Sequence, residues 1–131
     1  MITRDEIRAI PELHKSIQRD MGHLDYLREK ATSVPSGISD GERVQTSPKN
    51  DGNKYVEAAV DLCRDIQRKE AELEDLQARA KEFISTIGES LPRKVMTLRY
   101  LDCCEWDQVA DLAGYTERRV QQVEFEVVSQ I

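Results

Sequence analysis

Aromatic residues are scarce in this 131-residue sequence, at 5%, and it has only six glycines and four prolines. A core with so few rings must be built mainly from Leu, Ile, Val and Ala side chains. Because Gly and Pro interrupt regular structure, their scarcity and the charged fraction of 34% favour long amphipathic helices over sheet. We therefore expect an all-α fold, organised as one domain or two small ones.

Long apolar runs are also missing. No run approaches the roughly 20 residues that a membrane span needs, and the charged N-terminus does not resemble a signal peptide. Three cysteines, an odd number, form no disulfide framework and are typical of a reducing cytoplasm. The adjacent Cys103 and Cys104, with His14 and His23 far away, lack the spacing of metal ligands. We expect a cytoplasmic protein with no membrane partner and no bound metal.

Catalytic motifs are absent as well. The sequence has no Gly-rich phosphate loop, no nucleophile motif and no evident acid–base pair. The many Glu residues are more typical of solvated helix faces. We therefore expect neither an enzyme nor a cofactor.

The net charge is −6, and residues 91–131 carry −2 of it, which argues against strong non-specific binding to nucleic acid.

The chain begins with a predicted helix. Thr3 and Glu6 have the spacing of a capping box, and Pro11 either kinks this helix or moves its effective start to Ile10. From there, residues recur in alternating steps of three and four, a heptad seam with one charged member: Ile10, Leu13, Ile17, Asp20, Leu24, Leu27 and Ala31.

A second long helix is predicted from about residue 54 to residue 87. Its seam also has one charged member: Tyr55, Ala59, Leu62, Ile66, Lys69, Leu73, Leu76, Ala80, Phe83 and Ile87. Residues 32–53, rich in Ser, Gly, Pro, Asp and Asn, are expected to be an irregular linker. Residues 1–90 should therefore form an antiparallel coiled-coil hairpin.

The two charged seam residues suggest a register for this hairpin. If Ile17 lies opposite Lys69 and Asp20 opposite Ile66, the two charges lie one layer apart and can pair. Such a pair would fix the register rather than add net stability. The alternative is that Lys69 extends its aliphatic stem along the seam and keeps its ammonium group in water.

Residues 91–131 predict a compact three-helix unit. Apolar residues of the segment 93–101 and of the helix 106–113 recur at helical spacing, and Gly114 supplies the turn. Thr116 can cap a last helix whose inner face is Val120, Val123 and Val127. A pattern typical of a helix-turn-helix is formed by the small residue Ala110, by Gly114 four positions later, and by Val120 and Val123 beyond the glycine. The core of the unit should be Trp106, Val109, Ala110, Val120 and Val123.

The stretch LRYLDCCEWDQVADLAGYTERRVQQV resembles region four of the bacterial sigma factors. The whole chain is similar to small phage and prophage proteins related to the ArpU- and RinA-type late transcription regulators. This resemblance implies a DNA-binding transcriptional regulator in a bacterial host cell. Double-stranded DNA is the implied partner, and RNA polymerase is a second candidate.

The resemblance also implies roles for individual residues. Thr116 would cap the recognition helix and touch a phosphate. Four residues would face the groove and read base edges: Glu117, Arg118, Gln121 and Gln122. Four basic residues would lie on or near phosphates: Arg93, Lys94, Arg99 and Arg119. Glu124 and Glu126 stand where relatives often carry basic residues and would repel phosphate if they faced DNA, and Phe125 falls on the outward face.

Two function classes follow. The first is a phage-type regulator whose C-terminal unit binds promoter DNA. The second is a coiled-coil structural or interaction protein whose helix-turn-helix contacts protein, such as RNA polymerase, instead of DNA. In both function classes, apolar seam side chains that stay exposed on the two long helices predict a homodimer.

Overall fold

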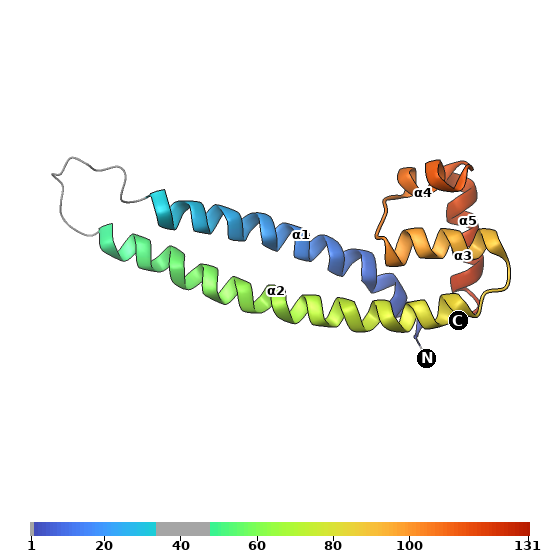
Figure 1. The fold of residues 1–131 in the computed structure, drawn as a ribbon, viewed down its shortest axis with the longest axis horizontal. Helices are drawn as coiled ribbons and strands as arrows, with labels where there is room; N and C mark the ends of the chain where they lie inside the picture. The colour runs from blue at the N-terminus through green and yellow to red at the C-terminus, as the bar shows by residue number, and fades with distance from the viewer. Residues whose placement is uncertain (1, 34–47) are drawn as a thin grey trace. The chain divides into compact units, whose positions relative to one another are not determined.

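The computed structural model of the protein describes residues 2–33 and 48–131, and within these ranges it contains helices and no strands. The predicted all-α class is therefore confirmed. The described elements follow one another along the chain (Figure 1): α1 (Arg4–Ser33), α2 (Pro48–Ser85), α3 (Ser90–Met96), the π-helical segment η2 (Thr97–Leu101), α4 (Trp106–Ala113) and α5 (Glu117–Val128). None of these helices has an apolar stretch long enough to cross a membrane.

The chain folds as two compact units. Met1–Lys15 and Ala71–Ile131 form the first unit, and Ser16–Glu70 form the second. The domain boundary expected at residue 90 falls inside the first unit, because the start of α1 and the end of α2 share a hydrophobic core with the C-terminal helices. The residues expected to bind DNA all belong to this first unit.

Helix α1 starts as its capping box predicts. The Thr3 backbone N–H donates to Glu6 Oε1 at 2.9 Å, and the Glu6 N–H donates to Thr3 Oγ1 at 3.2 Å. The helix continues through Pro11 as far as Ser33, so the later start at Ile10 is not what occurs. Both ends of the linker expected over 32–53 are helical, because α2 already begins at Pro48. Residues 34–47 of that linker lie outside the described residues.

In the second unit, α1 and α2 run in opposite directions. Asp20 contacts Lys69, and Arg28, further along α1, contacts Cys63, which comes earlier in α2. Four predicted seam residues are buried here: Ile17, Leu24, Leu27 and Ile66. Lys69 Nζ lies 2.6 Å from Asp20 Oδ2 and 2.7 Å from Ser16 Oγ, so the predicted charge pair is confirmed.

The first unit has a core to which both ends of the chain contribute. Its buried residues come from five helical elements and the segment before α1: Ile2, Ile7, Ile10, Leu76, Ala80, Ile84, Met96, Tyr100 and Val128. Arg79 binds both carboxylate oxygens of Glu6, at 3.1 and 2.6 Å. This bidentate contact, with the Thr3 hydrogen bonds, lowers the pKa of Glu6 to about 2. The N-terminal residues therefore belong structurally with the C-terminal helices.

The three short C-terminal helices surround a second cluster of buried side chains: Val95, Val109, Ala110, Val120 and Val123. Trp106 packs against this cluster and is half-buried, as is Val127, which was expected further inside. Two left-handed residues turn the chain between helices, Cys103 at φ 54° and Gly114 at φ 80°. The turn predicted at Gly114 is therefore confirmed, and it lets α5 pack across α3 and α4 (Figure 1).

The Asp20–Lys69 pair gives a testable prediction. Each side chain is only about a quarter exposed, at 21% and 26%. Lys69→Leu or Asp20→Leu alone should destabilise the protein by about 1–3 kcal/mol, because a charge is left in the seam without its partner. The double variant should recover most of that loss, since an apolar pair fills the same layer. Urea unfolding followed by circular dichroism measures all four free energies.

The matched control is Arg68→Leu, on the same turn of α2. Arg68 lies 3.3 Å from Asp65, and both side chains are largely exposed. Its loss should change stability by no more than about 0.5 kcal/mol. Additive losses in the Asp20–Lys69 double variant would contradict an energetic coupling between the two side chains.

Candidate nucleic-acid interface

Helix α5 presents a polar face to solvent. Thr116 is its N-cap, and its Oγ1 accepts a hydrogen bond from the backbone N–H of Arg119 at 3.1 Å. The predicted cap is therefore confirmed. The four side chains expected to face a groove are all exposed: Glu117, Arg118, Gln121 and Gln122. Guanidinium, amide and carboxylate groups of this kind match the donors and acceptors on base edges.

The opposite face of α5 buries a carboxylate. Glu124 is only 4% exposed and lies among three buried valines: Val120, Val123 and Val128. The Tyr100 hydroxyl donates a hydrogen bond to Glu124 Oε2, and Arg8 of α1 lies 3.5 Å from Glu124 Oε1. These two partners offset the cost of removing the charge from water. The possibility that Glu124 faces DNA is therefore excluded by this placement.

The same contact changes the chemistry of Tyr100. Burial, followed by the hydrogen bond to Glu124, raises the pKa of Tyr100 well above its ordinary value of 10. Sequence analysis did not single out Tyr100 or the Glu124 contact. One signal was present, because Glu124 follows Val120 by four residues and so shares its face of the helix.

Two basic residues of α3 differ in their surroundings. The Arg93 guanidinium donates to the carbonyl oxygens of Ile87 and Gly88, at 3.1 and 3.2 Å, beyond the end of α2. Lys94 is exposed, and its side chain extends from the helix surface. Arg93 therefore has a structural role in joining α2 to α3, and any phosphate contact would have to use its remaining donors.

Arg99 is held inside the C-terminal helices. Its Nη1 donates to the carbonyl oxygen of Cys104 at 3.0 Å, and its guanidinium lies 4.5 Å from the centre of the Trp106 ring. This cation–π contact and hydrogen bond fix the connection between η2 and α4. Of the four basic residues expected near phosphates, Arg99 is the one that is not exposed.

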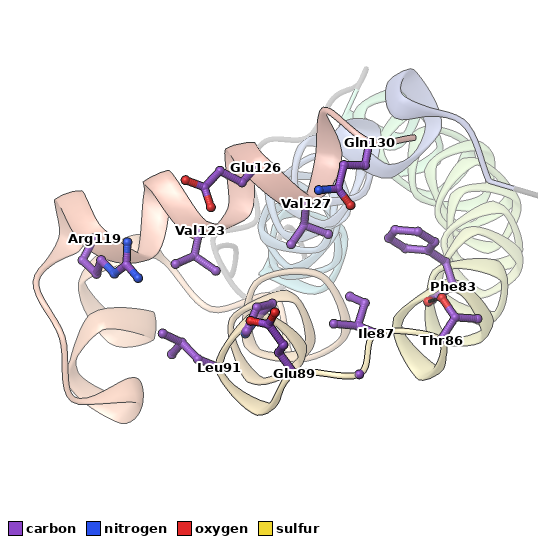
Figure 2. A pocket seen from close by; sticks show the side chains of 12 residues that line it. Phe83, Thr86, Ile87, Glu89, Leu91, Arg119, Val123, Glu126, Val127 and Gln130 are labelled. Carbon is purple, nitrogen blue, oxygen red and sulfur yellow. Dashed lines mark hydrogen bonds between the residues drawn. The ribbon is translucent and has the colours of Figure 1, made fainter.

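A groove of about 470 Å³ lies beside α5 (Figure 2). Arg119 and Glu126 of α5 line it (Figure 2), together with apolar side chains from α5, α3, the end of α2 and the segment after α2: Phe83, Ile87, Leu91, Val123 and Val127. Arg119 therefore lies on the side of α5 that borders this groove. The groove combines an apolar lining with charged groups of both signs.

The buried Tyr100–Glu124 contact gives a second prediction. Tyr100→Phe should destabilise the protein by about 1–3 kcal/mol, because the carboxylate loses its donor while it remains buried. Because the folded state raises the pKa of Tyr100, wild-type stability should be lost as pH rises above about 10, and this loss should be smaller in Tyr100→Phe. Urea unfolding at several pH values measures both effects.

Tyr115→Phe is the control, since Tyr115 is exposed and its hydroxyl should contribute less than about 0.5 kcal/mol. Phenolate absorbance provides an independent check. One of the four tyrosines should stay protonated after the others have ionised, and ionisation of all four together near pH 10 would contradict the buried contact.

Among residues 2–33 and 48–131, no group of His, Cys, Asp and Glu side chains is arranged to hold a metal ion. Comparisons with protein-family models, curated proteins and solved structures find no match to this chain. The functional assignment therefore rests on the geometry of the first unit and on the sequence motifs of residues 91–131.

Proposed function

We propose that residues 91–131 form a helix-turn-helix unit that binds double-stranded DNA, with α5 as its recognition helix. On this proposal the protein is a transcriptional regulator of the phage or prophage type that its sequence resembles. The long helices of residues 1–90 would act as a coiled-coil hairpin that carries the unit. Helix α4, the turn at Gly114 and the capped start of α5 are the parts that such a unit requires.

The observation that carries this proposal is the separation of the two faces of α5. Its inner face is buried against α3 and α4, while Arg118, Gln121 and Gln122 all point to solvent. An α-helix of this kind fits the major groove of B-form DNA, which is about 12 Å wide. Arg can bond guanine with two donors, and Gln can pair with adenine through one donor and one acceptor.

The inward position of Glu124 supports the same proposal. An exposed carboxylate in the middle of α5 would repel the phosphate backbone, and this one is buried with Tyr100 and Arg8. Lys94 and Arg119 remain exposed at the surface of the unit, where they would contact phosphates. The net charge of −6 then predicts binding through this local face rather than through the protein as a whole.

A homodimer is part of the proposal. Several apolar side chains of the second unit are about half exposed: Met21, Tyr26, Val56 and Val60. Pairing of two copies through the long helices would cover such residues, and a twofold dimer is the commonest arrangement. Two recognition helices would then meet two half-sites roughly 34 Å apart on the DNA.

A protein partner is the second candidate, and the groove beside α5 favours it. Its apolar lining and its charged residues, Arg119 and Glu126, are suited to a short amphipathic segment of a protein such as RNA polymerase. In this case α5 would serve as a wall of the groove, and its outer face would read no bases.

A binding titration separates the two candidates. The full-length protein should bind one duplex fragment of the promoter region that neighbours its gene in preference to others. The logarithm of its affinity should fall linearly with the logarithm of salt concentration, because phosphate contacts release counterions. Fluorescence anisotropy with labelled fragments measures this. A folded sample of known oligomeric state that binds no fragment at low salt would exclude direct DNA recognition.

Two substitutions test the assignment of individual residues. Arg118→Ala should cost about 1–3 kcal/mol on the preferred fragment and relax the preference at one base pair, because it removes a base contact. Lys94→Ala should weaken binding to all fragments alike and reduce the salt slope by about one. Identical effects of the two variants on every fragment would contradict a division into base-reading and phosphate-binding residues.

A further inference from the structure

Phe125 is the most exposed large apolar side chain among the described residues, at 63%. It lies seven residues after Arg118 and three after Gln122, so the three side chains form one row along α5. All three are exposed. An aromatic ring exposed beside polar side chains forfeits hydrophobic stabilisation unless a partner covers it.

The core of the first unit holds Phe125 in this outward position. Its neighbour Glu124 is fixed inward by Tyr100 and Arg8. Rotation of α5 to bury Phe125 would pull the Glu124 carboxylate away from both partners and expose the valines that flank it. The exposure of Phe125 is therefore imposed by the packing of the helix, and it is not a result of loose packing at its end.

The row is also long enough to reach successive base pairs when α5 lies along the major groove. Seven residues separate Arg118 from Phe125, and at 1.5 Å per residue this span is roughly 10 Å. The major groove, about 12 Å wide, admits an α-helix along its floor. A helix that places Arg118 against one base pair would therefore hold Phe125 over the groove floor as well, two or three base pairs away along the duplex axis, at about 3.4 Å per step.

The chemistry of the groove floor selects a partner for the ring. Phe can neither donate nor accept a conventional hydrogen bond, so it gains nothing from the polar edges of guanine, adenine or cytosine. Thymine alone among the four standard bases presents an apolar group there, its C5-methyl. We propose that Phe125 determines specificity by packing against the C5-methyl group of a thymine in the target site. This inference rests on the proposed DNA-binding function.

Replacement of thymine by deoxyuridine tests this contact, because it removes the methyl group and leaves every hydrogen-bonding group in place. A preferred duplex is first selected from a random library with the full-length protein. Each thymine is then replaced singly. At one position per half-site the wild-type affinity should fall about 3- to 10-fold, as expected for the loss of one buried methyl group. Other positions should change little.

The variant Phe125→Ala should bind the thymine and uracil duplexes equally and match the wild type on the uracil duplex. Phe125→Leu should keep part of the discrimination because it keeps an apolar side chain. Leu112→Ala is the matched control: Leu112 is also an exposed large apolar residue, at 57%, but it lies on α4 and has no part in the proposed contacts. It should retain the full wild-type sensitivity to uracil. Circular dichroism verifies that each variant is folded.

Three outcomes would overturn the inference, and they are distinguishable. A wild type that binds duplex DNA but is indifferent to uracil at every position would refute the methyl contact and leave the proposed function intact. A folded wild type that binds no DNA would refute both the methyl contact and the proposed function. Loss of self-association in Phe125→Ala, measured by analytical ultracentrifugation, would identify the ring as a contact between protein copies.

Discussion

The buried carboxylate of Glu124 constrains the whole first unit. A charged group at this depth is tolerated only where partners reach it, and here the Tyr100 hydroxyl and the Arg8 guanidinium do so. One partner comes from η2 and the other from α1, so three segments distant in sequence must meet at one point. An apolar residue in place of Glu124 would pack against the same valines without requiring any particular partner. The carboxylate therefore adds a directional requirement to the hydrophobic contacts that hold α5.

That requirement decides which side chains α5 offers to solvent. With Glu124 turned inward, Arg118, Gln122 and Phe125 must face outward, since they lie on the other side of the helix. The acidic charge that the sequence places in the middle of α5 is thereby removed from the outer face. Glu126 faces the neighbouring groove (Figure 2). The outer surface of α5 therefore loses one of the three carboxylates of the helix, while Glu117 and Glu126 remain exposed.

Local patterns predicted much of the fold, and long-range contacts account for what they missed. The cap at Thr116, the turn at Gly114 and the Asp20–Lys69 pair follow from spacing, because each depends on near neighbours or on one repeating seam. The Tyr100–Glu124 contact joins residues 24 positions apart on different helices, which no periodicity relates. The boundary expected at residue 90 assumed that each domain is one continuous segment of the chain. The core of the first unit instead combines residues 1–15 with residues 71–131.

The distribution of basic residues bears on how such a unit would hold DNA. Arg93 and Arg99 use donors within the protein, so Lys94 and Arg119 are the two proposed phosphate-binding residues whose side chains are left for DNA. A single unit would therefore neutralise few phosphates, and its affinity alone would be weak. Linking two units raises their effective concentration on adjacent half-sites and multiplies the affinity without new contacts. On the proposed function, the long helices thus provide affinity by joining copies, while α5 provides sequence preference.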